Sequence, residues 1–225
     1  RHAWGGAAKA LAQHGWRALV VDQRGHGDSD WAPANYYRID HFARDMRALA
    51  AWFTSPPAVV GASLGGIATL LGVGEAPNSA AVASAVILVD ITPTVERAGV
   101  ERIVNFMQKR MHDGFASLND AADYVASYLP DRPRPKSTAG LEKNLRLKDD
   151  GRWYWHWDPG FMTDVDTRTE DRDSERMKAA TRRLAVPALL VRGGKSDLVT
   201  PETAQEFVAL APDARFVDVA AAGHM

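Results

Sequence analysis

The stretch Val59–Gly72, "VVGASLGGIATLLG", decides the fold because its pattern changes at one residue, Ser63. Before this serine, a short run of small and β-branched apolar residues is typical of a buried strand. After it, Leu64, Ile67 and Leu71 recur at the spacing of one helix face. The stretch therefore predicts a strand, a tight turn that carries Ser63, and a helix.

The same turn fits the pattern G-x-S-x-G, with glycine at Gly61 and Gly65. A side chain at either glycine would collide with the neighbouring strand or helix in so tight a turn. The helix that begins at Leu64 directs its N-terminal N–H groups toward the serine oxygen, so the Leu64 N–H is a candidate donor to an oxyanion. We interpret Ser63 as a candidate nucleophile at a strand-turn-helix elbow.

The amino-acid composition argues against several classes of protein. The 225 residues are 46% hydrophobic, which is enough for one large core without a metal or disulfides. The 27 basic and 28 acidic residues give a formal charge of -1 and are mixed along the chain, so nucleic acid is not an expected partner. Cysteine is absent, which fits a reducing compartment and a cytoplasmic location. The longest apolar run, near residues 80–91, is too short for a membrane span.

Strand and helix patterns alternate at both ends of the chain. The predicted strands are 17–22, 58–62, 85–90, 187–193 and 214–220. Such alternation predicts an α/β fold, with a mostly parallel sheet and helices on both of its faces.

Between residues 92 and 184 the alternation stops and amphipathic helical segments replace it. So long an insertion exceeds an ordinary crossover connection, and we expect a helical cap over the carboxyl ends of the strands. The expected organisation is a core formed by 1–91 and 185–225, with the cap at 92–184 inserted after the strand that ends at Asp90.

The predicted cap contains a dense aromatic segment, "GRWYWHWDP", with Trp153, Trp155 and Trp157. Two interpretations stay open for these side chains. They pack the cap onto the core, or they line a pocket for the substrate.

A nucleophilic serine needs a base within hydrogen-bond reach and an acid that orients the base. Asp197 follows a predicted strand in the loop "RGGKSDLVT", and His224 follows the last strand in "AAAGHM". The chain order Ser63, Asp197, His224 matches the order expected for this kind of elbow. Asp90, at the end of "AVILVD", is the alternative acid.

Four segments, "VVDQRGHGDSD", "VVGASLGG", "RGGKSDLV" and "AAGHM", together resemble the α/β-hydrolase superfamily. The resemblance is to its capped group, which includes serine esterases, cofactor-free perhydrolases, carbon–carbon bond hydrolases, epoxide hydrolases and haloalkane dehalogenases. It implies that Ser63 is the nucleophile, His224 the general base and Asp197 the acid. The last two groups use aspartate at the elbow, so serine argues against both.

The sequence also departs from that group. Its members usually carry a His-Gly motif after an early strand, and this motif supplies the second oxyanion N–H. The motif, the first strands and the closing helix are absent from the sequence, so we expect a part of a longer protein with the second donor upstream of residue 1.

The function expected from these patterns is hydrolysis of a small carboxylic ester through an acyl-enzyme. The segment "GASLGG" lacks a nucleotide-binding fingerprint, so no cofactor is expected. A metal is not expected either, because a site at His156 and Asp158 would need more ligands than the local sequence offers. The alternatives are a carbon–carbon bond hydrolase, a perhydrolase, or a ligand-binding protein of the same fold that does not catalyse. The oligomeric state is left open.

Overall fold

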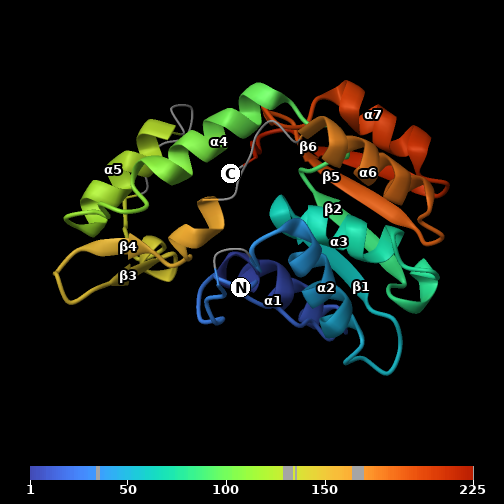
Figure 1. The fold of residues 1–225 in the computed structure, drawn as a ribbon, viewed down its shortest axis with the longest axis horizontal. Helices are drawn as coiled ribbons and strands as arrows, with labels where there is room; N and C mark the ends of the chain where they lie inside the picture. The colour runs from blue at the N-terminus through green and yellow to red at the C-terminus, as the bar shows by residue number, and fades with distance from the viewer. Residues whose placement is uncertain (34–35, 129–133, 135, 164–169, 225) are drawn as a thin grey trace. The chain divides into compact units, whose positions relative to one another are not determined.

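The computed structural model describes residues 1–33, 36–128, 134, 136–163 and 170–224. The chain divides into two compact units (Figure 1). The first unit comprises residues 1–37 and 104–164, and the second comprises 38–103 and 165–225. This division differs from the expected boundaries, because the described residues 92–103 and 170–184 belong to the unit that contains the sheet and residues 1–37 do not.

The second unit contains a four-stranded sheet in the order β1-β2-β5-β6 (Figure 1). Its strands are β1 (Ala58–Ala62), β2 (Ala85–Val89), β5 (Ala188–Gly193) and β6 (Ala214–Val219). All three neighbouring pairs are parallel, so the carboxyl ends of the strands meet at one edge. The predicted parallel sheet is confirmed for these four strands.

Helices flank this sheet in the way that the alternation predicted. They are α2 (Ile39–Ala50), α3 (Leu64–Gly74), α6 (Glu170–Arg182) and α7 (Pro201–Leu210), together with the short 3-10 turn η3 (Ser79–Ala81). The start of α7 follows the sequence closely, because Thr200 caps the helix and Pro201 occupies its first turn. In the described part of the chain, every helix is too short or too polar to span a lipid bilayer.

The core of the second unit lies where the central strands meet the flanking helices. Val86 and Leu88 of β2 and Leu190 of β5 have no exposed surface, as expected for central strands of a parallel sheet. Leu70 of α3 and Phe207 of α7 are buried in the same cluster. Each such side chain contributes about 1.5–3 kcal/mol of transfer free energy, so this cluster holds the strands and helices in register.

The first unit is built from helices and one small hairpin. Its elements are η1 (His2–Trp4), α1 (Gly5–Gln13), α5 (Leu118–Tyr128), η4 (Leu141–Lys143), β3 (Leu145–Leu147), β4 (Trp153–Trp155) and η5 (Pro159–Met162). Strands β3 and β4 are antiparallel. The boundary between the units falls inside α4 (Arg97–Lys109).

One predicted strand is not formed. Residues 17–22 have no strand structure, and Leu19 and Val21 are 54% and 39% exposed. A strand is stabilised by the hydrogen-bonded ladder to its neighbour, and none of the described strands pairs with this segment. An apolar run alone was therefore insufficient to predict a strand here.

Candidate active site

Ser63 is the one residue between the end of β1 and the start of α3. Its φ of 47° and ψ of -123° lie in a region that residues with a side chain rarely adopt. The Ser63 N–H donates to the carbonyl of Val89 at 3.3 Å, and its own carbonyl accepts from the N–H groups of Gly66 and Ile67. The strained turn is thus held from both sides, by the sheet and by the first turn of the helix.

Glycines make this turn sterically accessible. A Cβ atom at Gly61 would lie 2.2 Å from the carbonyl oxygen of Gly65, which is closer than such contacts occur in proteins. A Cβ atom at Gly66 would lie 2.2 Å from a side-chain methyl carbon of Ile91. The predicted close approach is confirmed at Gly61, and Gly66 is a further contact that the motif did not indicate.

The structure brings His224 between Ser63 and Asp90. The His224 Nε2 atom lies 3.3 Å from Ser63 Oγ, and the Nδ1 atom lies 2.8 Å from Asp90 Oδ2. The His224 and Asp90 side chains are only 6% and 5% exposed. Because the Asp90 carboxylate accepts a hydrogen bond from the Nδ1–H group, Nε2 is left without a proton and can accept the hydroxyl proton of Ser63. This is the geometry that a serine nucleophile and its general base require.

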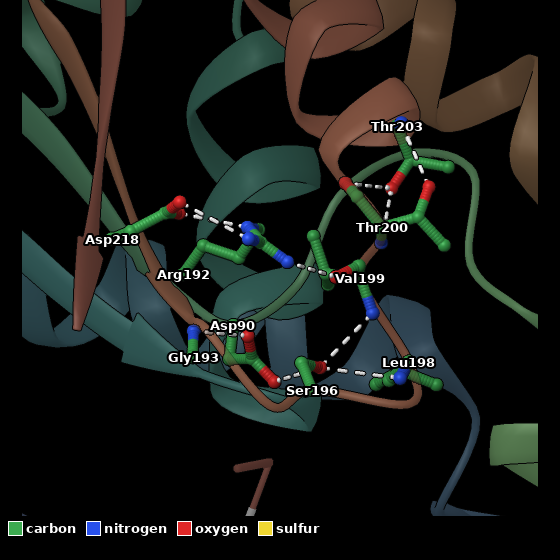
Figure 2. A network of polar contacts seen from close by, with 9 residues as sticks. All are labelled: Asp90, Arg192, Gly193, Ser196, Leu198, Val199, Thr200, Thr203 and Asp218. Atoms are coloured by element: carbon green, nitrogen blue, oxygen red, sulfur yellow. Dashed lines mark hydrogen bonds and ion pairs between the residues drawn. The ribbon is translucent and has the colours of Figure 1, made fainter. Parts of the chain in front are cut away.

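Asp90 is buried directly after β2, with a positive φ of 51°. Its Oδ1 atom accepts a hydrogen bond from the Gly193 N–H at 2.8 Å, and its Oδ2 atom accepts one from the Ser196 hydroxyl at 2.6 Å (Figure 2). Burial alone would raise the pKa of Asp90, but the hydrogen bonds from His224, Ser196 and Gly193 hold this pKa below its ordinary value. Asp90 is therefore a carboxylate at neutral pH.

The structure does not bring Asp197, the predicted acid, into contact with His224. Asp197 Oδ2 instead lies 2.5 Å from a guanidinium nitrogen of Arg102, in a partly exposed ion pair. Arg102 belongs to α4, and no pattern in the sequence connected this helix with the loop that carries Asp197. The acid that contacts His224 is Asp90, which the sequence had left as the alternative.

A signal for Asp90 was nevertheless present in the sequence. Asp90 is the first residue after β2, whereas Asp197 lies in the loop beyond the end of β5. In the observed register Ala62 of β1 pairs with Val89 of β2, so the residues that follow them, Ser63 and Asp90, emerge side by side. Had the sequence analysis predicted that β2 pairs with β1, it would have favoured Asp90 over Asp197 as the acid.

Leu64, the predicted oxyanion donor, is the first residue of α3. The first N–H groups of an α-helix have no acceptor within the helix, so they are available to an anion at its N-terminus. The role of Leu64 stays a prediction, as does the second donor expected upstream of residue 1.

The three tryptophans that were candidates for a substrate pocket lie in the first unit. Trp153 and Trp155 belong to β4, and the Trp155 ring is 5.2 Å from that of buried Phe115, in an edge-to-face contact. Trp157 is itself buried. These contacts account for packing inside the unit, and a role in substrate binding stays a prediction.

Within the described ranges, no group of three or more histidine, aspartate and glutamate side chains is placed to hold a metal ion.

Comparison with known proteins finds hydrolases among the proteins that this chain is similar to. A 3-hydroxybutyrate-oligomer hydrolase from Cupriavidus necator is 29% identical over 93% of this chain and 73% of its own length. A 2-(acetamidomethylene)succinate hydrolase from Mesorhizobium japonicum is 26% identical over 92% of this chain and 71% of its own.

Solved structures show the same fold. An α/β hydrolase from Novosphingobium aromaticivorans matches with a TM-score of 0.79 and 25% identity, over 99% of this chain and 78% of that protein. An esterase from Mycobacterium tuberculosis matches with a TM-score of 0.67 and 27% identity, over 99% of this chain and 74% of that protein. Residues 1–225 also match the family described as the alpha/beta hydrolase fold. The chain belongs to the α/β-hydrolase fold family.

Proposed function

We propose that this chain is a serine hydrolase that cleaves carboxylic esters of small substrates, with Ser63 as nucleophile, His224 as general base and Asp90 as acid. The observation that carries the proposal is the position of His224, which reaches Ser63 through one ring nitrogen and Asp90 through the other. A serine hydroxyl becomes an effective nucleophile only with such a base beside it.

In the acylation step, Ser63 Oγ forms a bond to the ester carbonyl carbon while its proton moves to His224 Nε2. The carbonyl oxygen becomes an oxyanion that accepts a hydrogen bond from the Leu64 N–H at the start of α3. When the intermediate collapses, the bond to the leaving alcohol breaks and His224 returns the proton to the departing oxygen. The products are an acyl-serine and the free alcohol.

Water completes the cycle by the same route. His224 removes a proton from a water molecule, whose oxygen attacks the acyl carbonyl, and the bond to Ser63 breaks as the serine regains its proton. Asp90 stays ionised throughout and stabilises the positive charge that His224 carries in both steps. Its low pKa, caused by the hydrogen bonds that offset its burial, suits this role.

The relatives support ester chemistry through their names, which include an oligomer hydrolase of 3-hydroxybutyrate, a diacylglycerol lipase and an esterase. We expect the purified chain to hydrolyse short-chain p-nitrophenyl esters, and the assay extends to 3-hydroxybutyrate oligomers and monoacylglycerols to define the acyl group. Release of p-nitrophenol and of titratable acid measures turnover. A folded chain that cleaves a vinylogous diketone but no ester would contradict the proposal and favour carbon–carbon bond hydrolysis.

A further inference from the structure

The loop that follows β5, residues 194–199, contacts Asp90 and the backbone that leads to His224. The Gly194 N–H donates to the carbonyl of Val219 at 2.9 Å, and the Lys195 N–H donates to the carbonyl of Ala222 at 2.8 Å. Ala222 lies two residues before His224 in the chain. The β5 loop is therefore bonded to the backbone that leads to the general base.

Glycine permits this close approach. A Cβ atom at Gly193 would lie 2.9 Å from the carbonyl oxygens of Ala222 and Gly223. A Cβ atom at Gly194 would lie 2.8 Å from the Cα atom of Ala220. Gly193 and Gly194 therefore allow the β5 loop to pack closely against residues 220–223.

Ser196 connects the same loop to the acid. Its hydroxyl oxygen lies 2.6 Å from Asp90 Oδ2, and it accepts hydrogen bonds from the N–H groups of Leu198 and Val199 at 3.2 Å and 3.0 Å (Figure 2). A hydroxyl has one proton to donate and two lone pairs to accept with. Because the two N–H groups occupy both lone pairs, the proton of Ser196 is directed to the carboxylate.

Arg192 fixes the far end of the loop. Its guanidinium group is buried, forms two hydrogen bonds to the carboxylate of Asp218 on β6, and donates to the carbonyl of Val199 at 3.2 Å (Figure 2). Paired N–H donors from an arginine give a carboxylate contact of defined geometry. Val199 is therefore held through its carbonyl by Arg192 and through its N–H by Ser196.

We propose that Ser196 is a positioning residue, which holds the Asp90 carboxylate ionised and oriented toward Nδ1 of His224. The role deepens the proposed function and rests on it, because Ser196 acts through Asp90 and not on the substrate. With the carboxylate fixed, Nδ1 of His224 keeps its proton and Nε2 stays an acceptor for Ser63. The β5 loop thus contributes the hydroxyl of Ser196, and not the carboxylate of Asp197, to the site.

The test compares Ser196→Ala with Ser196→Thr, which keeps the hydroxyl. We expect Ser196→Ala to lower kcat by about tenfold, the order of one hydrogen bond to a charged group, with KM changed less than about twofold. Ser196→Thr is expected to restore most of the rate. Ser79→Ala is the matched control, because Ser79 is buried and also accepts a backbone N–H, from Ala185, but it precedes β2 at the opposite end of the strands.

A second readout does not depend on turnover. The carboxyl ¹³C resonance of Asp90, assigned by its loss in Asp90→Asn, reports the ionisation of this side chain. Ser196 donates to the ionised form, so Ser196→Ala is expected to raise the pKa of Asp90 and move the titration midpoint to higher pH. Ser79→Ala is expected to leave the midpoint in place.

An unchanged midpoint in Ser196→Ala, or a loss of rate equal in Ser196→Ala and Ser79→Ala, would overturn the positioning role. If the midpoint moves but the unmodified chain hydrolyses no ester, the hydrogen-bond role of Ser196 stands and the proposed ester chemistry fails. The two proposals can therefore fail separately.

Discussion

Replacing Ser63 by alanine is expected to lower kcat for ester hydrolysis by at least about a thousandfold without unfolding the protein. The variant removes the only atom that can form the acyl-enzyme, while His224 and Asp90 remain. Alanine keeps the Cβ atom, so the positive φ at this turn is no more strained than in the native chain. The variant is checked by steady-state kinetics together with thermal unfolding followed by circular dichroism.

Ser84 provides the control for this substitution. It is an exposed serine immediately before β2, and Ser84→Ala is expected to leave both kcat and Tm unchanged. Turnover in Ser63→Ala within tenfold of the native value would remove Ser63 from the role of nucleophile.

The substitution Asp90→Asn is expected to lower kcat by about a thousandfold or more. An amide in place of the carboxylate no longer stabilises the imidazolium of His224, and its N–H group favours the ring tautomer whose Nε2 carries the proton. That tautomer cannot accept the hydroxyl proton of Ser63. Steady-state kinetics with a short-chain ester measures the loss, and circular dichroism confirms that the variant folds.

Asp197→Asn is the matched variant, because it makes the same chemical change to the other carboxylate. It removes an exposed ion pair with Arg102, and pairs of this kind contribute about 0–1 kcal/mol to stability. We expect kcat within about threefold of the native value. A large loss in Asp197→Asn with little change in Asp90→Asn would return the acid to the β5 loop.

The elbow that carries Ser63, the proposed nucleophile, could be predicted from the sequence because its signal is local. A strand, a glycine-flanked serine and a helix lie within Val59–Gly72, and each part constrains the next through backbone geometry alone. His224 was predictable for a similar reason, since it follows the final strand of a parallel sheet whose carboxyl ends share one edge.

The carboxylate that contacts His224 could not be predicted in this way, because its place depends on contacts between distant segments. Asp90 lies beside Ser63 because β2 pairs with β1, and Asp197 is drawn to Arg102 of α4. Neither neighbour relation is encoded in hydrophobic periodicity. Ser196 was overlooked for the same reason, although it stands next to Asp197 in the sequence.

The predicted strand at residues 17–22 failed for a related physical reason. Its continuous apolar run is compatible with a buried strand, but strand structure requires a hydrogen-bonded neighbour, and the described strands supply none. The unit boundaries also depend on such tertiary contacts, which explains why the described residues 92–103 and 170–184 belong to the unit that contains the sheet.

The central claim is that Ser63 is an activated nucleophile, and the most direct test is covalent labelling. The purified chain is incubated with a fluorophosphonate probe, and the adduct is measured by intact mass and located by peptide mapping. The account predicts one adduct per chain, on Ser63, and its loss in Ser63→Ala. A folded chain that remains unlabelled, or that is labelled at another residue while Ser63 stays unmodified, would contradict it.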